Sequence, residues 1–321
     1  MASIPAARSK LKRSQNRFVA VTLSPIMLYM MFFTLVPMAW AVVITLFSYS
    51  PVRQGGFLGL GGGNPFIGLN NYIELFSNTL NGSLFQMAVK NTLIFALIVL
   101  PLNLVITLPL AVFIESTKDP YKTIFRMIYF LPTVTSMVAV SLIWKNVIFH
   151  PVFGMLNAIL RSLHWQTYNW LIDSHTQVLG IPIPMLACII VYVWMDMGYN
   201  VVIFMAGLQG IPDVFREAAI VDGANAWQRF WNITLPLLRS TLTFVVVMTM
   251  LSSWQVFVIF SVMTDNGGPN NLTRTLVLHI YEGAFRDQAM GLASAAAMAL
   301  FAIIMVTTLV QMRLLRKDWE Y

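Results

Sequence analysis

Residues 211–239 read IPDVFREAAIVDGANAWQRFWNITLPLLR, a polar but patterned segment between two long apolar ones. Pro212 can open a helix, because the amide hydrogen that it lacks would have no partner at that position. Gly223 permits the left-handed turn that commonly ends a helix. A second helical stretch from about Ala226 brings Trp227 and Phe230 to one side. The segment is therefore predicted to be a short helix-turn-helix that lies outside the membrane.

The rest of the chain is too apolar for a soluble protein of its size. Of its 321 residues, 58% are hydrophobic and 10% are charged, whereas soluble domains average roughly 45–50% apolar and about 25% charged residues. Six apolar segments are each long enough to cross about 30 Å of hydrocarbon. They cover residues 18–48, 88–114, 124–149, 184–208, 240–263 and 290–313. The predicted fold class is all-α: a polytopic membrane protein with six transmembrane helices.

Positive charges divide unequally between the two sides of these spans. One side carries fourteen, namely Arg8, Lys10, Lys12, Arg13, Arg17, Lys118, Lys122, Arg126, Arg216, Arg229, Arg239, Arg313, Arg316 and Lys317. The other carries six, namely Arg53, Lys90, Lys145, Arg161, Arg274 and Arg286. Because cytoplasmic loops collect Lys and Arg, we expect both termini and the loops 115–123 and 209–239 in the cytoplasm. This segregation also explains the net charge of +7 without a nucleic-acid partner.

Several other classes of protein are disfavoured. The first apolar stretch is much longer than the roughly 7–15-residue core of a signal peptide, so we expect an uncleaved first helix. The single Cys188 allows no intrachain disulfide. The chain has no His-Glu-x-x-His, no Gly-x-Ser-x-Gly and no Gly-x-x-x-x-Gly-Lys-Ser/Thr, so neither enzymatic chemistry nor ATP binding is expected. The histidines are too scattered for a metal site: His150, His164, His175 and His279.

The loops on the outer side differ in character. The first, at about 49–86, is rich in glycine and is expected to be a flexible, turn-rich loop. The second carries apolar residues at helical spacing and predicts a short amphipathic helix on the membrane surface. These residues are Phe153, Leu156, Ile159, Leu160 and Leu163.

Residues 211–239 resemble the EAA loop of binding-protein-dependent ABC permeases, and we call them the EAA loop below. The family pattern is Glu-Ala-Ala, three residues, Gly, nine residues, Ile, one residue, Leu-Pro. Every fixed position is met here, at Glu217-Ala218-Ala219, Gly223, Ile233 and Leu235-Pro236. Other stretches are similar to the carbohydrate-uptake branch, which includes the maltose and glycerol-3-phosphate systems. They are 66–72, 154–157, 264–269 and 291–295.

The resemblance implies a type I ABC importer permease fold in the bacterial inner membrane. Residues 1–85 would form the cytoplasmic N-terminus, the first helix and an outer loop, and residues 86–321 the permease core. The implied partners are a second permease in a heterodimer, two ATPase subunits that bind ATP and Mg, and an external solute-binding protein. The chain itself would need no cofactor. The residues implied to couple to the ATPase are Glu217, Ala218, Ala219, Asp222 and Gly223.

A candidate solute pathway comes from the two spans that flank the EAA loop. Asp196 is an ionisable residue inside a span and is therefore a functional candidate. Tyr192, Asp196, Tyr199 and Ile203 share one helical face. Hydroxyls and amides on such a face suit sugars, although hydroxyls also hold helices together. With what the maltose-type resemblance implies, the candidate substrate contacts are Met195, Asp196, Tyr199, Thr249, Ser252, Ser253 and Val256.

Some alternatives stay open at the level of sequence. Asn91 and Asn103 are interpreted as helix-packing residues. An ion-coupled secondary transporter could use Asp196 as a proton or sodium site, although the inverted repeats common in such carriers are not evident. The solute could be an oligosaccharide, a monosaccharide, a polyol or a glycerol-3-phosphate ester. The sequence also leaves open whether the second permease is an identical chain or a related one.

Overall fold

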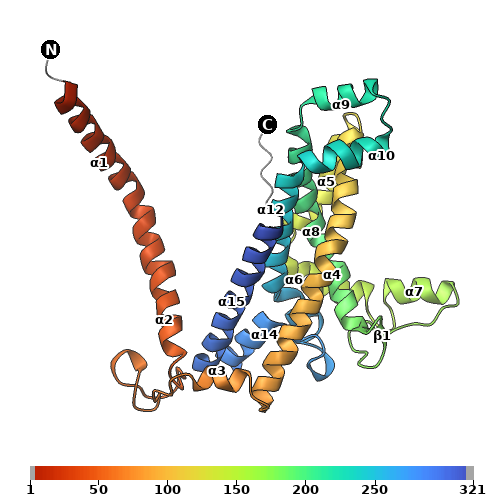
Figure 1. The fold of residues 1–321 in the computed structure, drawn as a ribbon. Coiled ribbons are helices and arrows are strands. Elements are labelled where there is room, and N and C mark those ends of the chain that lie inside the picture. Colours follow the sequence, from red (N-terminus) through yellow and green to blue (C-terminus); the bar gives the residue numbers. More distant parts are fainter. Residues whose placement is uncertain (1–3, 316–321) are drawn as a thin grey trace.

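The computed structural model describes residues 4–315, with side chains described from residue 15 onward, and most of this range is helical (Figure 1). Six of the fourteen positive residues that define the predicted cytoplasmic side fall outside the described side chains. These are Arg8, Lys10, Lys12, Arg13, Arg316 and Lys317.

Five helices in the described range are long and apolar enough to cross a membrane, and a bent helix pair makes up to six. The sequence-predicted all-α, multi-span fold class is thereby confirmed. The bounds of the spanning elements are α1 Ile4–Met30, η1 Met31–Leu35, α2 Val36–Ile44, α4 Leu80–Ser116, α5 Tyr121–Val134, α6 Met137–Ile143, η3 Trp144–Ile148, α8 Ile183–Gln209, α12 Arg239–Trp254, α13 Val258–Met263 and α15 Met290–Leu315.

The remaining elements are short. They are η2 Phe57–Gly59, α3 Asn70–Leu75, α7 Met155–Ser162, β1 Gln177–Val178, β2 Ile181–Pro182, α9 Asp213–Val221, α10 Ala226–Arg229, η4 Phe230–Thr234, α11 Leu235–Leu237, η5 Pro269–Asn271, α14 Leu276–Tyr281 and η6 Glu282–Arg286. The two strands form an antiparallel pair in which Gln177 faces Pro182. Helix α7 confirms the short helix predicted in the second outer loop.

Helix α8 lies at the centre of the bundle and packs against α4, α5, α12 and α13. In its most apolar stretch 61% of the residues are buried, against 22% in α15 at the edge. Gly198 allows α5 to approach α8 closely, because a Cβ atom there would lie only 2.3 Å from the carbonyl oxygen of Tyr129. Helix α8 is therefore the element on which the other spans are positioned.

The first helix, α1–η1–α2, stands away from the bundle (Figure 1). None of the most apolar part of Gln15–Ile44 is buried within the chain. It joins the bundle at its far end, where α2 packs against α15 and the amide of Asn71 donates hydrogen bonds to the carbonyl oxygens of Thr45 and Phe47, at 2.7 and 2.9 Å.

The third predicted span, 124–149, is not a straight helix. Its halves, Tyr121–Val134 and Met137–Ile148, meet at an angle of 94°. Two threonine hydroxyls favour this break. Thr135 is extended and donates to the carbonyl oxygen of Leu131, at 3.0 Å. The hydroxyl of Thr133 donates not to a carbonyl of its own helix but to the carbonyl oxygen of Met195 in α8, at 2.8 Å.

The fifth predicted span, 240–263, is also interrupted. Helix α12 ends at Trp254, α13 begins at Val258, and the exposed Gln255 lies in the gap. A break inside a membrane leaves backbone groups that need new partners. Here the hydroxyl of Thr275 donates to the freed carbonyl oxygen of Val256, at 3.2 Å.

Candidate functional site: a protruding loop and a polar cluster between spans

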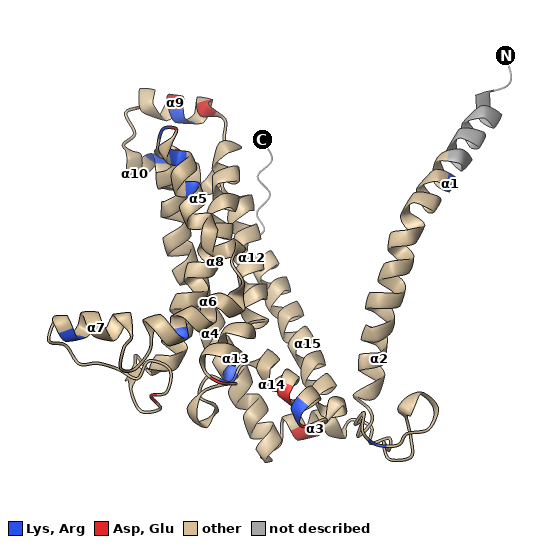
Figure 2. Ribbon diagram, turned by 180° about the vertical axis from the view of Figure 1, so that it is seen from behind, with Lys and Arg blue, Asp and Glu red and all other residues tan. Residues whose placement is uncertain are grey.

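The EAA loop forms the end of the molecule that carries α9 and α10 (Figure 1). Helix α9 begins after Pro212, as predicted, and has Asp213 in its first turn, where a negative charge favours the helix dipole. Glu217 and Ala218 are exposed, whereas Ala219 is buried. Figure 2 shows Lys and Arg positions on α5, α9 and α10 at this end of the molecule, with acidic positions also on α9.

Gly223 makes the predicted left-handed turn, with φ of +76°. Its amide donates to the carbonyl oxygen of Ile220 at 3.0 Å, and the amide of Ala224 donates to that of Ala219 at 2.9 Å. No atom lies within 4 Å of a Cβ built on Gly223. The requirement for glycine is therefore conformational and not steric, since only glycine adopts this φ readily. Asp222 directly precedes this residue and closes α9.

The second helix of the loop is held by a reciprocal cap. The side chain of Asn225 accepts from the amide of Gln228, and the side chain of Gln228 accepts from the amide of Asn225, both at 2.9 Å. The aromatic residues predicted to share a side are in contact: the ring of Trp231 lies 5.4 Å from the rings of both Trp227 and Phe230. The loop is thus a rigid helix-turn-helix joined directly to α8 and α12.

A polar cluster connects α4, α8 and α12 and consists of Asn103, Asp196, Asn200 and Thr249. The Oδ2 atom of Asp196 accepts from the side-chain amides of Asn103, at 2.8 Å, and Asn200, at 2.7 Å. The amide of Asn200 also lies 2.9 Å from Asn103 Oδ1 and 3.3 Å from Thr249 Oγ1. Within the described residues Asp196 has no cationic partner, and its Oδ1 atom accepts no hydrogen bond. The half-buried carboxylate therefore keeps one oxygen available.

A second polar contact joins α8 and α12. The hydroxyl of Tyr192 on α8 donates to Ser252 Oγ on α12, at 2.9 Å, and Ser252 Oγ donates to the carbonyl oxygen of Thr249, at 3.1 Å. Any rotation of α8 against α12 would have to break or remake this contact.

The structure separates the predicted substrate contacts into groups. Asp196 and Thr249 are linked through the amide of Asn200, and Ser252 donates to the carbonyl oxygen of Thr249. Met195 and Val256 are buried, and the hydroxyl of Ser253 is fully buried and donates back to the carbonyl oxygen of Thr249, at 2.7 Å. Tyr199 faces outward, with 41% of its surface exposed.

Two members of the cluster were not found as site residues from the sequence. Asn103 was interpreted as a packing residue, and Asn200 was not singled out. The spacing could have indicated Asn200, because it follows Asp196 by four residues and so lies on the same face. Asn103 carries no such signal, because it lies on another helix, 93 residues away in sequence. Asn91 does act in packing: its amide donates to the carbonyl oxygens of Asn271 and Arg274, at 3.3 and 3.1 Å.

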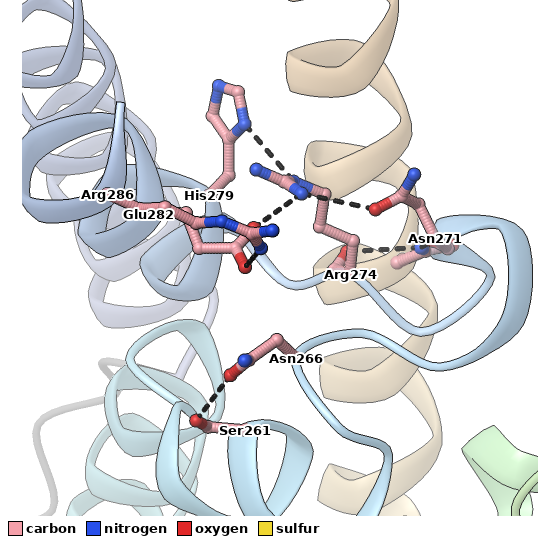
Figure 3. A network of polar contacts seen from close by, with 8 residues as sticks. Ser261, Asn266, Asn271, Arg274, His279, Glu282 and Arg286 are labelled. Atoms are coloured by element: carbon pink, nitrogen blue, oxygen red, sulfur yellow. Dashed lines mark hydrogen bonds and ion pairs between the residues drawn. The ribbon is translucent and has the colours of Figure 1, made fainter. Parts of the chain in front are cut away.

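A charge network around the buried Arg274 and Glu282 lies in the segment between α13 and α15 (Figure 3), which includes α14 at the end of the molecule away from α9 (Figure 1). Arg274 forms a 2.6 Å ion pair with Glu282 and donates from Nε to the Nδ1 atom of His279, at 3.3 Å. Arg286 also contacts Glu282, at 3.3 Å. Burial, with the neighbouring Arg274 guanidinium, lowers the pKa of His279 to about 4. The imidazole is therefore neutral, and the network fixes the segment that leads from α13 into α15.

The family model and the related proteins that this chain matches are all components of transport systems. Residues 107–317 match the family model described as "Binding-protein-dependent transport system inner membrane component". The chain is 33% identical over 289 residues to the "Probable ABC transporter permease protein YurN" of Bacillus subtilis, a match that covers 87% of this chain and 94% of that protein. It is 32% identical over 293 residues to the "Multiple sugar-binding transport system permease protein MsmF" of Streptococcus mutans, a match that covers 89% of this chain and 94% of that protein.

The fold is also similar to that of solved structures. One is described as "Crystal structure of bacterial alginate ABC transporter in complex with alginate pentasaccharide-bound periplasmic protein". A chain of that structure matches with a TM-score of 0.76 and 21% identity, over 94% of this chain and 95% of that one.

Proposed function

This chain belongs to the family of binding-protein-dependent transport system inner membrane components, and from that membership we propose that it is the permease subunit of an ATP-driven carbohydrate importer. The observation that carries the proposal is the family match over 107–317, which contains the EAA loop and both flanking spans. Relatives whose names include arabinooligosaccharides, multiple sugars and lactose support a sugar or sugar-like solute. None of the comparisons supports the ion-coupled alternative.

The chain supplies the membrane path and its partners supply the rest. Two ATPase subunits bind and hydrolyse ATP, an external binding protein delivers the solute, and a second, related permease completes the pathway. The family match and the apolar spans support a place in the bacterial inner membrane, and the charge distribution supports cytoplasmic termini. The most apolar part of α1–η1–α2 is not buried within the chain, and its surface suits the second permease as well as lipid.

The EAA loop is the surface that we assign to the ATPase. Glu217 and Ala218 are exposed on α9, and a carboxylate can make a charge-assisted contact with a basic group of the partner. Ala219 packs inward, while Asp222 and Gly223 set the turn that fixes the direction of α9. Because α9 follows α8 by only a few residues, movement of the loop acts directly on the span that carries Asp196.

The polar cluster is the part of the pathway that we assign to the solute. Sugar hydroxyls donate well to a carboxylate, and Asp196 has an oxygen without a hydrogen-bond donor in the described residues. Thr249 is linked to Asp196 through Asn200, Ser252 contacts Thr249, and the exposed ring of Tyr199 can stack on an apolar sugar face. The buried positions of Met195, Thr249, Ser253 and Val256 suit support of these groups better than direct contact.

Solute-stimulated ATP hydrolysis tests this proposal. The chain would be purified with the second permease, the ATPase and the binding protein, and hydrolysis measured with binding protein loaded from a panel of neutral sugars, polyols and glycerol-3-phosphate esters. Stimulation by a member of the sugar panel, lost when this chain is omitted, is the expected result. Hydrolysis that is independent of this chain would contradict it.

A further inference from the structure

A cavity of about 350 Å³ lies where the EAA loop meets the ends of α4 and α8. Its size falls within the roughly 300–1,000 Å³ of small-molecule sites. Four of its walls are the apolar side chains Val112, Leu208, Ile220 and Phe230. The guanidinium-bearing residues Arg216, from α9, and Arg229, from α10, also line it. It therefore combines an apolar interior with two positive charges.

The positive charge of this cavity is not balanced by the described residues. Glu115 also lines the cavity, but it is already paired with the ammonium of Lys122 and accepts from the amide of Gln209, at 3.2 Å. Arg216 and Arg229 have neither an ion pair nor a hydrogen bond from their side chains in the described range. The cavity thus carries an excess of two positive charges, which favours an anionic ligand.

Helix α9 has two faces with different neighbours. Arg216 and Ile220, four residues apart, lie on the face above the cavity. Val214 and Val221 lie on the other face and are 70% and 86% exposed, and Glu217 shares that face by its spacing. The face assigned to the ATPase is therefore distinct from the one that carries Arg216.

The second helix of the loop has the features of an interfacial helix. Trp227 and Trp231, on either side of Arg229, are 69% and 47% exposed. Tryptophan concentrates at the level of lipid headgroups, and basic residues on such a helix attract anionic lipids. The cavity also adjoins Ser116, the last residue of the spanning helix α4. These features place the cavity at the membrane surface.

We propose that this cavity binds the headgroup of an anionic phospholipid from the cytoplasmic leaflet. Arg216 and Arg229 hold its phosphate, since guanidinium groups bind phosphate oxygens in pairs, and Val112 and Phe230 contact the glycerol and upper acyl chain. Because one arginine comes from each helix of the EAA loop, the lipid joins α9 to α10 and stiffens the loop. This inference rests on the cytoplasmic orientation given under the proposed function.

Native mass spectrometry of the complete transporter tests the proposal. The complex is extracted from vesicles made of equal parts phosphatidylcholine and phosphatidylglycerol, and the retained lipid is identified. The wild type should retain phosphatidylglycerol in preference by at least about tenfold, the ratio that 1.4 kcal/mol produces. An Arg216→Gln/Arg229→Gln variant should lose the preference, and a variant with lysine at both positions should keep part of it.

Arg313→Gln is the control for loss of a positive charge outside the cavity, because Arg313 is exposed on α15 and does not line the cavity. It should retain the wild-type preference. Equal retention of the two lipids by the wild type would overturn the proposal, as would equal loss in the control and the double variant. Uptake measured on the same preparations separates the two proposals, because a transporter that works without lipid preference overturns only this one.

Discussion

Gly223→Asp should uncouple the ATPase from the spans, and the structure provides a matched control. Gly180 has φ of +78°, close to the +76° of Gly223, and neither residue has an atom within 4 Å of a built Cβ. Aspartate at either position meets the same backbone penalty for the left-handed region, at most about 1–2 kcal/mol because aspartate tolerates this region better than other L residues. Gly180 lies in the β1–β2 turn, far along the chain from the EAA loop.

The expected functional loss follows from this penalty. If α9 relieves the strain by leaving its turn, the hydrogen bonds of Gly223 and Ala224 to α9 are lost, and the docked orientation becomes less populated. A cost of 1–2 kcal/mol lowers that population by roughly 5- to 30-fold. The aspartate at position 180 costs the same in folding but leaves α9 in place.

Stimulated ATP hydrolysis and co-purification of the ATPase are the two readouts, each normalised to assembled protein. Stimulation of ATP hydrolysis should be roughly 5- to 30-fold weaker in the Gly223→Asp variant, whereas Gly180→Asp should behave like the wild type. Wild-type stimulation in Gly223→Asp, or equal losses in the two variants, would refute the reasoning.

Four further outcomes are expected. Reporter fusions at Asn81 and Trp319 should report opposite sides of the membrane, and the same side for both would contradict the topology. Asp196→Asn should assemble in normal yield and keep partial uptake, since its described partners are neutral amides and no buried cation is left unpaired; a collapse in yield would argue for an ion pair. Tyr199→Ala should lower uptake at unchanged ATPase docking, whereas unchanged rate and affinity would remove the ring from the pathway. The pKa of His279, about 4, lies below its ordinary 6.5, so the unfolded chain binds the proton more tightly than the folded chain. The free energy of unfolding should therefore fall by up to roughly 3 kcal/mol as the pH is lowered from 6.5 to 4. Thermal unfolding over this range should show a steeper fall in the wild type than in His279→Gln.

The features that follow from local sequence were predicted well. Helix α8 begins and ends within one residue of the predicted 184–208, because an apolar run has sharp limits where Pro184 and Gly210 stand. The turn at Gly223 was predicted because only glycine adopts its φ without strain. In both cases the determining residues are neighbours in the chain.

The features that depend on contacts between distant segments were not predicted. The break after Val134 reflects a bond from Thr133 to α8, which no window of the third span contains. Likewise, the sequence does not show that Asn103 faces Asp196, because nothing in an apolar run fixes the rotation of one helix against another. Tyr199 shares the predicted face of Asp196, yet the packing of α4 and α12 covers only part of that face.

Uptake into proteoliposomes tests the central claim most directly. Vesicles containing this chain with its permease and ATPase partners would receive loaded binding protein outside and either internal ATP or an imposed proton or sodium gradient. ATP alone should drive accumulation of labelled sugar, and omitting the ATPase or the binding protein should abolish it. Accumulation driven by an ion gradient without the ATPase would contradict the account and assign Asp196 to ion coupling.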